Sequence, residues 1–342
     1  MKVAGIEVGD RPLILAPMED VTNPPFRKFC KKYGADWLYS EFVSADALVR
    51  SVNKSLKKLT IDETERPVTI QIYGRFIDSM VEAAKIVEEV RPDFIDINFG
   101  CPVKRVAQKG AGAGMLKDIP LMVEMTRQIV QAVKIPVTAK TRLGWDCEHI
   151  IIEDIAERLQ DVGIQALAIH GRTRSQMYSG EADWEPIARV KQNPRIKIPI
   201  IGNGDIDSPQ KVKEAFERYG VDGVMIGRAT IGKPWIFEQI KHYLSTGEIS
   251  PELSVPAQIE IIKEQILLSM EWLDEVRGLF HMRRHMACMF KGLPHFRDLR
   301  IQMLQAPTIE ELWGVFDQIA ERYGSMDPED LVEEDDFCDL SC

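Results

Sequence analysis

The sequence predicts an α/β fold: a (β/α)8 TIM barrel followed by a small C-terminal helical bundle. Eight short β-rich runs fill the first two-thirds of the 342-residue chain, and each is followed by a polar or glycine-rich loop and an amphipathic segment. From about residue 257 the pattern becomes helical, with no further β-rich run. An open doubly wound sheet is the alternative, but no G-x-G-x-x-G follows the first run.

Each β-rich run is mainly apolar, as buried parallel strands are, and the fourth to eighth runs end in polar or glycine-rich groups. In chain order the runs are LILAPM (13–18), WLYSEFV (37–43), VTIQIYG (68–74), FIDINFG (94–100), PVTAKTRLG (136–144), ALAIHGR (166–172), PIIGNGD (199–205) and GVMIGR (223–228). Eight such units in about 230 residues agree in number and size with a closed barrel.

Helices between the runs are predicted from apolar spacing and from end signals. In residues 208–220, Ser208 is the expected N-cap, Pro209 lies in the first turn and Gly220 ends the helix. In the segment before the fifth run, Asp118 is the expected N-cap, and apolar residues recur on one face up to Val133.

The composition changes after the eighth unit and gives the expected domain organisation. Residues 1–243 form the barrel, and the Ser-, Pro- and Gly-containing stretch 244–256 is typical of a linker. Residues 257–325 form the helical domain. Residues 326–342 form an acidic tail, which we expect to be disordered.

Charge and hydropathy restrict the class of protein. No stretch approaches the ~20 apolar residues of a membrane span. Glu7, Asp10 and Arg11 interrupt any signal-peptide pattern, so we expect a cytoplasmic protein. The net charge of -10 disfavours a generic nucleic-acid binder, but eight tail carboxylates leave about -2 (-10 plus 8) on the rest of the chain. A local basic face would therefore suffice for an RNA partner.

Polar groups at the ends of the runs form the candidate site, because the catalytic groups of TIM barrels lie at the carboxyl ends of strands. Lys140 and Arg142 are two residues apart and share a face, as do His170 and Arg172. Taken singly, such residues are usually solvated charges or hydrogen-bonded structural groups. The apolar neighbours of Lys140 nevertheless indicate burial, and a buried lysine is rare without a function.

The loops after the seventh and eighth runs predict a phosphate site. They are GNGD (202–205) and GRATIG (227–232). Glycines let backbone N–H groups approach phosphate oxygens, and Arg228 adds a positive fork. TIM barrels often bind phosphate with these two loops. We therefore expect a phosphorylated cofactor or substrate.

Cys101 lies just past the end of the fourth run, in FIDINFGCPVKR (94–105). Its thiol could be a filler, half of a disulfide, a metal ligand or a reacting group. Six scattered cysteines without an export signal do not predict a disulfide framework, and no nearby ligand pair predicts a metal site. A filler would more naturally lie within the strand than beyond it.

Seven motifs together resemble the tRNA-dihydrouridine synthase (Dus) family, and within it the bacterial DusB branch. They are APM (16–18), QIYG (71–74), DINFGCP (96–102), KTRLGW (140–145), HGRTRSQMYSG (170–180), IGNGDI (201–206) and MIGRATIGKPWIF (225–237). The resemblance implies an enzyme with tightly bound FMN that uses NADPH to reduce uridines of the tRNA D-loop to 5,6-dihydrouridine. The likeness to the DusB branch suggests that the modified uridine is at position 17 of the tRNA. It also implies a tRNA partner, no membrane, no obligate protein partner and a monomer.

The resemblance implies roles for individual residues as well. Cys101 would protonate C5 of the uracil after a hydride reaches C6, and its pKa should not be strongly depressed, because an acid must keep its proton. Asn98 and Arg172 would contact the substrate, as would Arg283 and Arg284 in the basic 283–300 segment. The expected cofactor-binding residues are Ala16, Pro17, Met18, Gln71, Lys140, His170, Asn203, Gly204, Asp205, Gly227 and Arg228. No metal is expected.

One position departs from the family pattern, and two other functions compete. Glu19 occupies a position in APMEDVT where family members commonly have a small neutral residue. The sequence therefore does not predict which contacts that loop makes. A flavin barrel reductase of a small pyrimidine or enone would not need the helical domain. An RNA-binding factor without chemistry would not need Cys101, Lys140 and His170.

Overall fold

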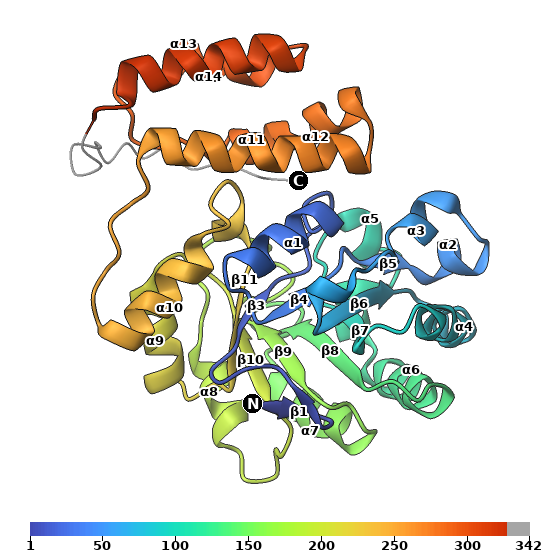
Figure 1. The fold of residues 1–342 in the computed structure, drawn as a ribbon. Coiled ribbons are helices and arrows are strands. Elements are labelled where there is room, and N and C mark those ends of the chain that lie inside the picture. Colours follow the sequence, from blue (N-terminus) through green and yellow to red (C-terminus); the bar gives the residue numbers. More distant parts are fainter. Residues whose placement is uncertain (327–342) are drawn as a thin grey trace. The chain divides into compact units, whose positions relative to one another are not determined.

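Eight parallel strands close into a barrel within residues 1–228, which confirms the predicted TIM fold (Figure 1). In this computed structural model, which describes residues 1–326, the strand order is β4-β3-β11-β10-β9-β8-β7-β6, and β4 pairs with β6 to close the ring. The strands are β3 (Leu13–Leu15), β4 (Trp37–Tyr39), β6 (Val68–Tyr73), β7 (Phe94–Phe99), β8 (Val137–Arg142), β9 (Leu167–His170), β10 (Ile200–Asn203) and β11 (Gly223–Ile226). Each strand lies in one of the eight predicted runs.

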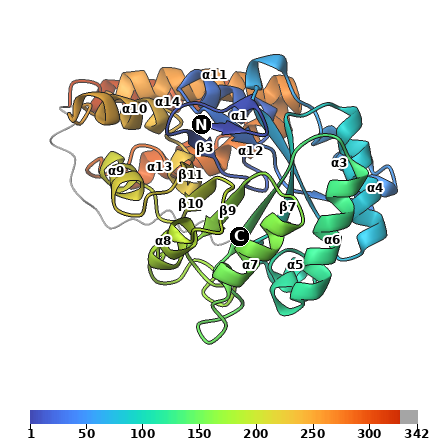
Figure 2. The same ribbon diagram turned by 90° about the horizontal axis from the view of Figure 1, so that it is seen from below.

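Helices surround these strands on the outside (Figure 2). The longer ones are α1 (Pro24–Lys32), α4 (Ile77–Glu89), α6 (Ile119–Ala132), α7 (Ile152–Asp161), α8 (Glu185–Gln192) and α9 (Pro209–Glu217). Short segments follow the strands: α2 (Ala45–Val49), α3 (Asn53–Lys57), α5 (Lys104–Ala107), the 3-10 turns η1 (Glu63–Glu65), η2 (Gly112–Lys117) and η3 (Arg228–Thr230), and the extra strand β5 (Val43–Ser44). Both predicted helices are confirmed. The Asp118 carboxylate caps α6 by accepting from the Leu121 N–H at 3.1 Å, whereas Ser208 occupies the N-cap of α9 without a side-chain bond.

The amino end of the barrel is packed with apolar side chains. Strands β1 (Lys2–Val3) and β2 (Ile6–Glu7) form an antiparallel hairpin, and Val3 joins the barrel-core cluster that includes Trp37 and Phe94. The rings of Trp37 and Phe94 lie 4.7 Å apart, and the indole N–H of Trp37 donates to the Thr69 hydroxyl at 2.6 Å. The interior is therefore a filled core, which leaves the carboxyl ends of the strands for a site.

The second unit is Ala229–Cys342, and its described part contains helices and connecting loops but no strand. Its helices are α10 (Ile236–Thr246), α11 (Val255–Trp272), α12 (Glu275–Met286), α13 (Arg297–Gln305) and α14 (Ile309–Tyr323). The division after Arg228 precedes the expected boundary at 243/244, and the expected linker 244–256 includes the last turn of α10 and the start of α11. The acidic tail lies outside the described residues, apart from Met326. Within residues 1–326 no helix has both the length and the apolar character needed to cross a membrane.

A buried ion pair fastens α1 to the loop before β6. The Nε of Arg27 donates to the Glu65 carboxylate at 2.8 Å, and both side chains are almost fully buried. The remaining Arg27 nitrogens donate to the carbonyl oxygens of Thr22 at 3.0 Å and Thr60 at 2.7 Å. Burial raises the pKa of Glu65, although Arg27 opposes that shift. The guanidinium therefore satisfies one oxygen, Oε2, of a carboxylate that has no access to water, and within residues 1–326 Oε1 is left without a hydrogen-bond partner.

We expect Arg27→Met to lower the free energy of unfolding by about 3–5 kcal/mol, because it leaves Glu65 as a buried, uncompensated charge. The loss should shrink as the pH falls and Glu65 takes up a proton. Urea denaturation at two pH values measures both effects. The control is Lys28→Met, which breaks an exposed pair with Asp62 (2.8 Å) and should cost less than about 1 kcal/mol. Equal losses in the two variants would contradict this account.

Candidate active site

A chain of buried hydrogen bonds leads from the barrel interior to Cys101. The Asp96 carboxylate accepts from the Thr138 hydroxyl at 2.6 Å and from the Gln71 amide at 2.7 Å. The Gln71 carbonyl oxygen accepts from the Asn98 amide at 2.8 Å. Burial raises the pKa of Asp96 to about 7, with Thr138 and Gln71 lowering it in part.

Asn98 completes this chain at the loop that carries Cys101. Its side-chain oxygen accepts from the backbone N–H groups of Gly100 and Cys101, both at 2.9 Å. Gln71 and Asn98 thus use most of their hydrogen-bonding capacity within the protein, and each keeps one amide hydrogen for other contacts. Both side chains are buried, and their hydrogen bonds hold the loop that carries Cys101 in place.

Cys101 is a free thiol with only 8% of its surface exposed. Burial raises its pKa, which agrees with the expectation that it is not depressed, and the thiol therefore stays protonated at neutral pH. Cys30 and Cys147 are also free thiols.

Arg142 clamps the thiol loop to the loop after β9. Its Nε donates to the Gly100 carbonyl at 2.8 Å, and its Nη1 donates to the carbonyls of Thr173 at 3.0 Å and Met177 at 2.8 Å. The guanidinium also lies 5.6 Å from the ring centroid of Tyr178, an exposed aromatic residue. Arg142 thus holds the two loops together through Nε and Nη1. Its other terminal nitrogen, Nη2, makes none of these hydrogen bonds.

Lys140 lies beside Asn98 in the pairing of β8 with β7. Within residues 1–326 nothing accepts a hydrogen bond from its ammonium group. Burial, together with the charge of the neighbouring Arg142, lowers the pKa of Lys140 to about 8, although Asp96 and Cys101 act in the opposite direction. The Lys140 side chain is half-buried, so its ammonium remains free to donate to an acceptor oxygen or an anion supplied by a ligand.

His170 and Arg172 form a second polar group at the end of β9. Burial, followed by the charge of Arg142, holds the pKa of His170 well below its usual range, so the imidazole is neutral. Its Nε2 lies 3.4 Å from Arg172 Nη1, which donates; that assignment leaves the proton on Nδ1. A neutral imidazole is a poor acid at pH 7, which leaves Cys101 as the better proton source.

Asp205 orients two of the cations at the mouth. Arg172 donates to both of its carboxylate oxygens, at 2.8 and 2.7 Å, and Arg228 donates at 3.0 Å. Burial alone would raise the pKa of Asp205, but Arg172 and the N–H of Ala182 lower it overall. Asp205 is therefore a positioning carboxylate, and Arg228, which is 46% exposed, has capacity left for a phosphate.

Close backbone approaches bring the remaining predicted residues together. A Cβ on Gly204, whose φ is +127°, would lie 2.7 Å from the Ala182 side chain and 3.0 Å from the His170 ring. A Cβ on Gly227 would lie 3.5 Å from Ala16 and 3.7 Å from the Met18 sulfur. The loops after β3, β9, β10 and β11 therefore meet, with Pro17 half-buried between Ala16 and Met18, and Asn203 donating to the Met225 carbonyl at 2.8 Å.

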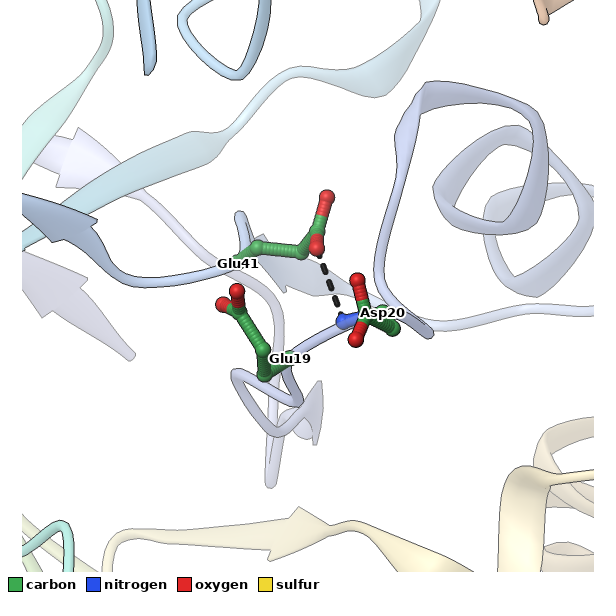
Figure 3. Close-up of side chains that lie close together, drawn as sticks. All are labelled: Glu19, Asp20 and Glu41. Atoms are coloured by element: carbon green, nitrogen blue, oxygen red, sulfur yellow. Dashed lines mark hydrogen bonds between the residues drawn. The ribbon is translucent and has the colours of Figure 1, made fainter. Parts of the chain in front are cut away.

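Glu19, the departure from the family pattern, belongs to an acidic cluster with Asp20 and Glu41 (Figure 3). Its carboxylate lies 2.6 Å from the ammonium of Lys58, which is also 3.3 Å from Glu41. Glu41 in turn accepts from the backbone N–H of Asp20 at 2.8 Å, the dashed line in Figure 3. Lys58 thus offsets part of the negative charge of Glu19 and Glu41, and Glu19 ties the loop after β3 to the segment around Lys58.

Two of the predicted tRNA contacts, Arg283 and Arg284, lie in the helical unit near the end of α12. Arg283 donates to the Ala306 carbonyl at 3.3 Å, and its guanidinium lies 4.1 Å from the Phe280 ring centroid. Arg284 is half-buried next to it. His285 is fully buried and lies 3.3 Å from the Gln265 amide. Part of this basic segment therefore has a structural role inside the helical unit.

Two site residues were not among those predicted from the sequence. Asp96 lies two residues before Asn98 on the same face of β7, so the two-residue period that related Arg142 to Lys140 could have indicated it. Tyr178 lies 4.9 Å from Arg228 and 6.4 Å from the His170 ring, measured to ring centroids. It is on an irregular loop, and no periodic signal marks it.

These features define a TIM-barrel enzyme with its site at the carboxyl ends of the strands. The family model for dihydrouridine synthase (Dus) matches residues 14–321. The chain is 42% identical to tRNA-dihydrouridine synthase B of Pseudomonas aeruginosa, over 85% of this chain and 87% of that protein. It is 38% identical to a probable tRNA-dihydrouridine synthase of Rickettsia bellii, over 95% and 98%. The chain belongs to the dihydrouridine synthase family, as its motifs predicted.

Among solved structures, the barrel is similar to that of a 2-naphthoyl-CoA reductase in complex with 2-naphthoyl-CoA. The TM-score is 0.58 at 13% identity, over 71% of this chain and 51% of that chain. The chain thus spans about half the length of that protein. At this identity the likeness shows a shared fold and nothing further.

Proposed function

We propose that this chain reduces the C5–C6 double bond of uridines in the D-loop of tRNA, with FMN as cofactor and NADPH as hydride donor. The observation that carries this proposal is the buried, protonated thiol of Cys101 beside the unpaired ammonium of Lys140. A reduction across C5–C6 needs one proton at C5 and a cation to balance the developing enolate charge. The site offers one group for each need.

The residues at the mouth fit a flat ring that ends in a phosphate. Four cations gather there, Lys140, Arg142, Arg172 and Arg228, and the nearby carboxylates of Asp96 and Asp205 are engaged by protein donors. Lys140 would hold an acceptor oxygen of the ring, and Arg228 with the glycine loops would hold the phosphate. When bound, FMN supplies the hydride that C6 receives.

The chain's own residues would supply the rest of the chemistry. As negative charge develops on the uracil oxygen, Lys140 or Arg172 would stabilise it. The Cys101 S–H bond would break, its proton would go to C5, and the thiolate would be reprotonated from solvent. Asn98 and Arg142 would keep the loop of Cys101 in position, because one binds its N–H groups and the other binds the Gly100 carbonyl.

A target base within folded tRNA must be extruded to reach a barrel mouth, so a second surface has to bind the RNA. We propose that the helical unit does so, with Arg283, Arg284 and the neighbouring basic residues at phosphates. We also propose that the protein works in the cytoplasm, where tRNA is available. We propose that it acts there as a monomer.

Two observations test the proposed function. Purified protein should carry about one FMN per chain, or regain it on reconstitution, and should be yellow. Mapping dihydrouridine in tRNA from a strain that lacks the gene should reveal missing positions, which the wild-type gene restores. Colourless protein that does not bind FMN, together with unchanged tRNA, would overturn the proposal.

A further inference from the structure

The amide network that supports the Cys101 loop, formed by Asp96, Gln71 and Asn98, runs in one direction only. At one end, the backbone N–H groups of Gly100 and Cys101 donate to Asn98 Oδ1, both at 2.9 Å, and a backbone N–H can only donate. At the other end, the Asp96 carboxylate accepts from Gln71 Nε2 at 2.7 Å, and an ionised carboxylate can only accept. These two ends fix which atom of each amide is the oxygen and which is the nitrogen.

Reversing either amide would break hydrogen bonds inside the protein. Asn98 Nδ2 donates to Gln71 Oε1 at 2.8 Å, so a reversed Gln71 would place its oxygen against the Asp96 carboxylate. A reversed Asn98 would place its NH2 group against two backbone N–H groups. The three side chains are at most 6% exposed, so water does not replace a lost bond. The cost of unpaired buried polar groups therefore holds the observed direction.

This direction decides what Asn98 offers to a ligand. Its oxygen accepts two hydrogen bonds, one for each lone pair, and one of its two amide hydrogens goes to Gln71. A single N–H remains. Asn98 is three residues before Cys101 and pairs in register with Lys140, so this N–H belongs to the same strand ends as the reacting groups. The position therefore suits an acceptor atom of a ligand and disfavours a second donor.

Uracil and cytosine differ in this respect at one ring position. C4 of uracil carries an oxygen, which accepts, whereas C4 of cytosine carries an amino group, which donates. An amide N–H directed at C4 pairs with uracil and meets another N–H in cytosine. A buried site that hydrogen-bonds one group of its substrate rejects an analogue without that group, because the polar groups of the site are then left unpaired.

We propose that Asp96 is a positioning residue that holds the amide of Asn98 as a donor toward C4 of the base, and that it thereby favours uridine over cytidine. This inference rests on the proposed function, in which a uridine of tRNA is the substrate. Asp96 acts through Gln71, whose orientation it sets, and touches no ligand itself. The Thr138 hydroxyl holds the carboxylate in turn by donating to Oδ1 at 2.6 Å.

Two exchanges of equal size, Asp96→Asn and Asn98→Asp, test the direction of the network without measuring activity. The pKa of Asp96 is about 7, so the carboxylate is mostly ionised at pH 8. At that pH, Asn98→Asp alone places a carboxylate at each end of Gln71, and one of them meets the amide oxygen. The unfolding equilibrium constant from urea denaturation should therefore rise about tenfold or more.

The double variant should reverse the whole network and recover stability. The new carboxylate at position 98 would accept from the two backbone N–H groups and from Gln71, and the new amide at position 96 would donate to Gln71 and accept from Thr138. Every hydrogen bond is then kept, so the unfolding constant should return to within about threefold of wild type.

The matched control combines Asp96→Asn with Asn203→Asp. Asn203 donates to the Met225 carbonyl at 2.8 Å, outside the amide network, so the effects of these two changes should add. Additive effects in the Asp96→Asn, Asn98→Asp pair as well, or a double variant less stable than Asn98→Asp alone, would overturn the proposal.

Competition between two transcripts tests the choice of base. They are one tRNA with uridine or cytidine at the modified position, bound to protein with excess FMN and no NADPH, so that no reduction takes place. Wild-type protein should bind the uridine transcript about tenfold more tightly, and in the double variant the preference should disappear or reverse. Equal binding by wild-type protein, or an unchanged preference in the double variant, would contradict the role of Asp96. If wild-type protein forms no dihydrouridine in any tRNA, the proposed function fails, while the stability measurements still report on the network.

Discussion

Cys101→Ala is expected to slow dihydrouridine formation about 10²–10⁴-fold, the usual contribution of a general acid. The variant should still bind FMN and still oxidise NADPH, because the thiol acts only after the hydride has reached C6. Single-turnover formation of dihydrouridine, with the flavin reduced beforehand, isolates this step. The wild-type rate should not fall through loss of the Cys101 proton below about pH 9, because burial raises the thiol pKa above its usual 9.0.

The matched control is Cys147→Ala, which removes an exposed free thiol on the loop after β8. It should retain the wild-type rate. If Cys101→Ala stayed within about twofold of wild type, the proton would have to come from another group or from water. Because His170 is neutral and hydrogen-bonded to Arg172, it would not be the first substitute.

Lys140→Met is expected to reduce dihydrouridine formation about 10²–10³-fold at saturating FMN, the cost of removing one donor to a developing oxyanion. The change should also weaken FMN binding, because Lys140 is the cation without an acceptor at the mouth. Flavin fluorescence of the apoprotein measures affinity separately from turnover. Lys134→Met, which removes an exposed lysine just before the same strand, serves as the control.

The pH dependence of FMN binding gives a second test of Lys140. Its pKa in the ligand-free protein is lowered to about 8, so the ammonium is fully charged below that pH and is lost above it. Wild-type affinity for FMN should therefore fall as the pH rises through 8, by at most tenfold per pH unit. Lys140→Met should lack this fall. An identical pH profile in both proteins would show that Lys140 does not touch the cofactor.

The barrel was predictable because its signals are local. Each strand lies in a run of mainly apolar residues, and Asp118 caps its helix as its side-chain chemistry predicts. The division of the chain was less predictable. Residues 244–246 look like linker by composition, yet they complete the last turn of α10, because the helix continues to Thr246 before Gly247 adopts a left-handed conformation.

The sequence predicted which residues form the site, but it did not predict the hydrogen bonds that connect them. Motif positions indicated Cys101, Asn98 and Gln71, yet no pattern in the sequence shows that their side chains form one chain of hydrogen bonds anchored on Asp96. Such pairings depend on which strands become neighbours and on their register. The same holds for Lys58, which is far from Glu19 in sequence and still forms an ion pair with it.

Purified protein, FMN, NADPH and an unmodified tRNA transcript, followed by nuclease digestion and mass spectrometry, test the central claim most directly. The account predicts 5,6-dihydrouridine at a D-loop uridine from wild-type protein and from Cys147→Ala, and only a small fraction of that product from Cys101→Ala in the same time. Flavin-loaded wild-type protein that oxidises NADPH but forms no dihydrouridine in any transcript would contradict it. So would full product from Cys101→Ala.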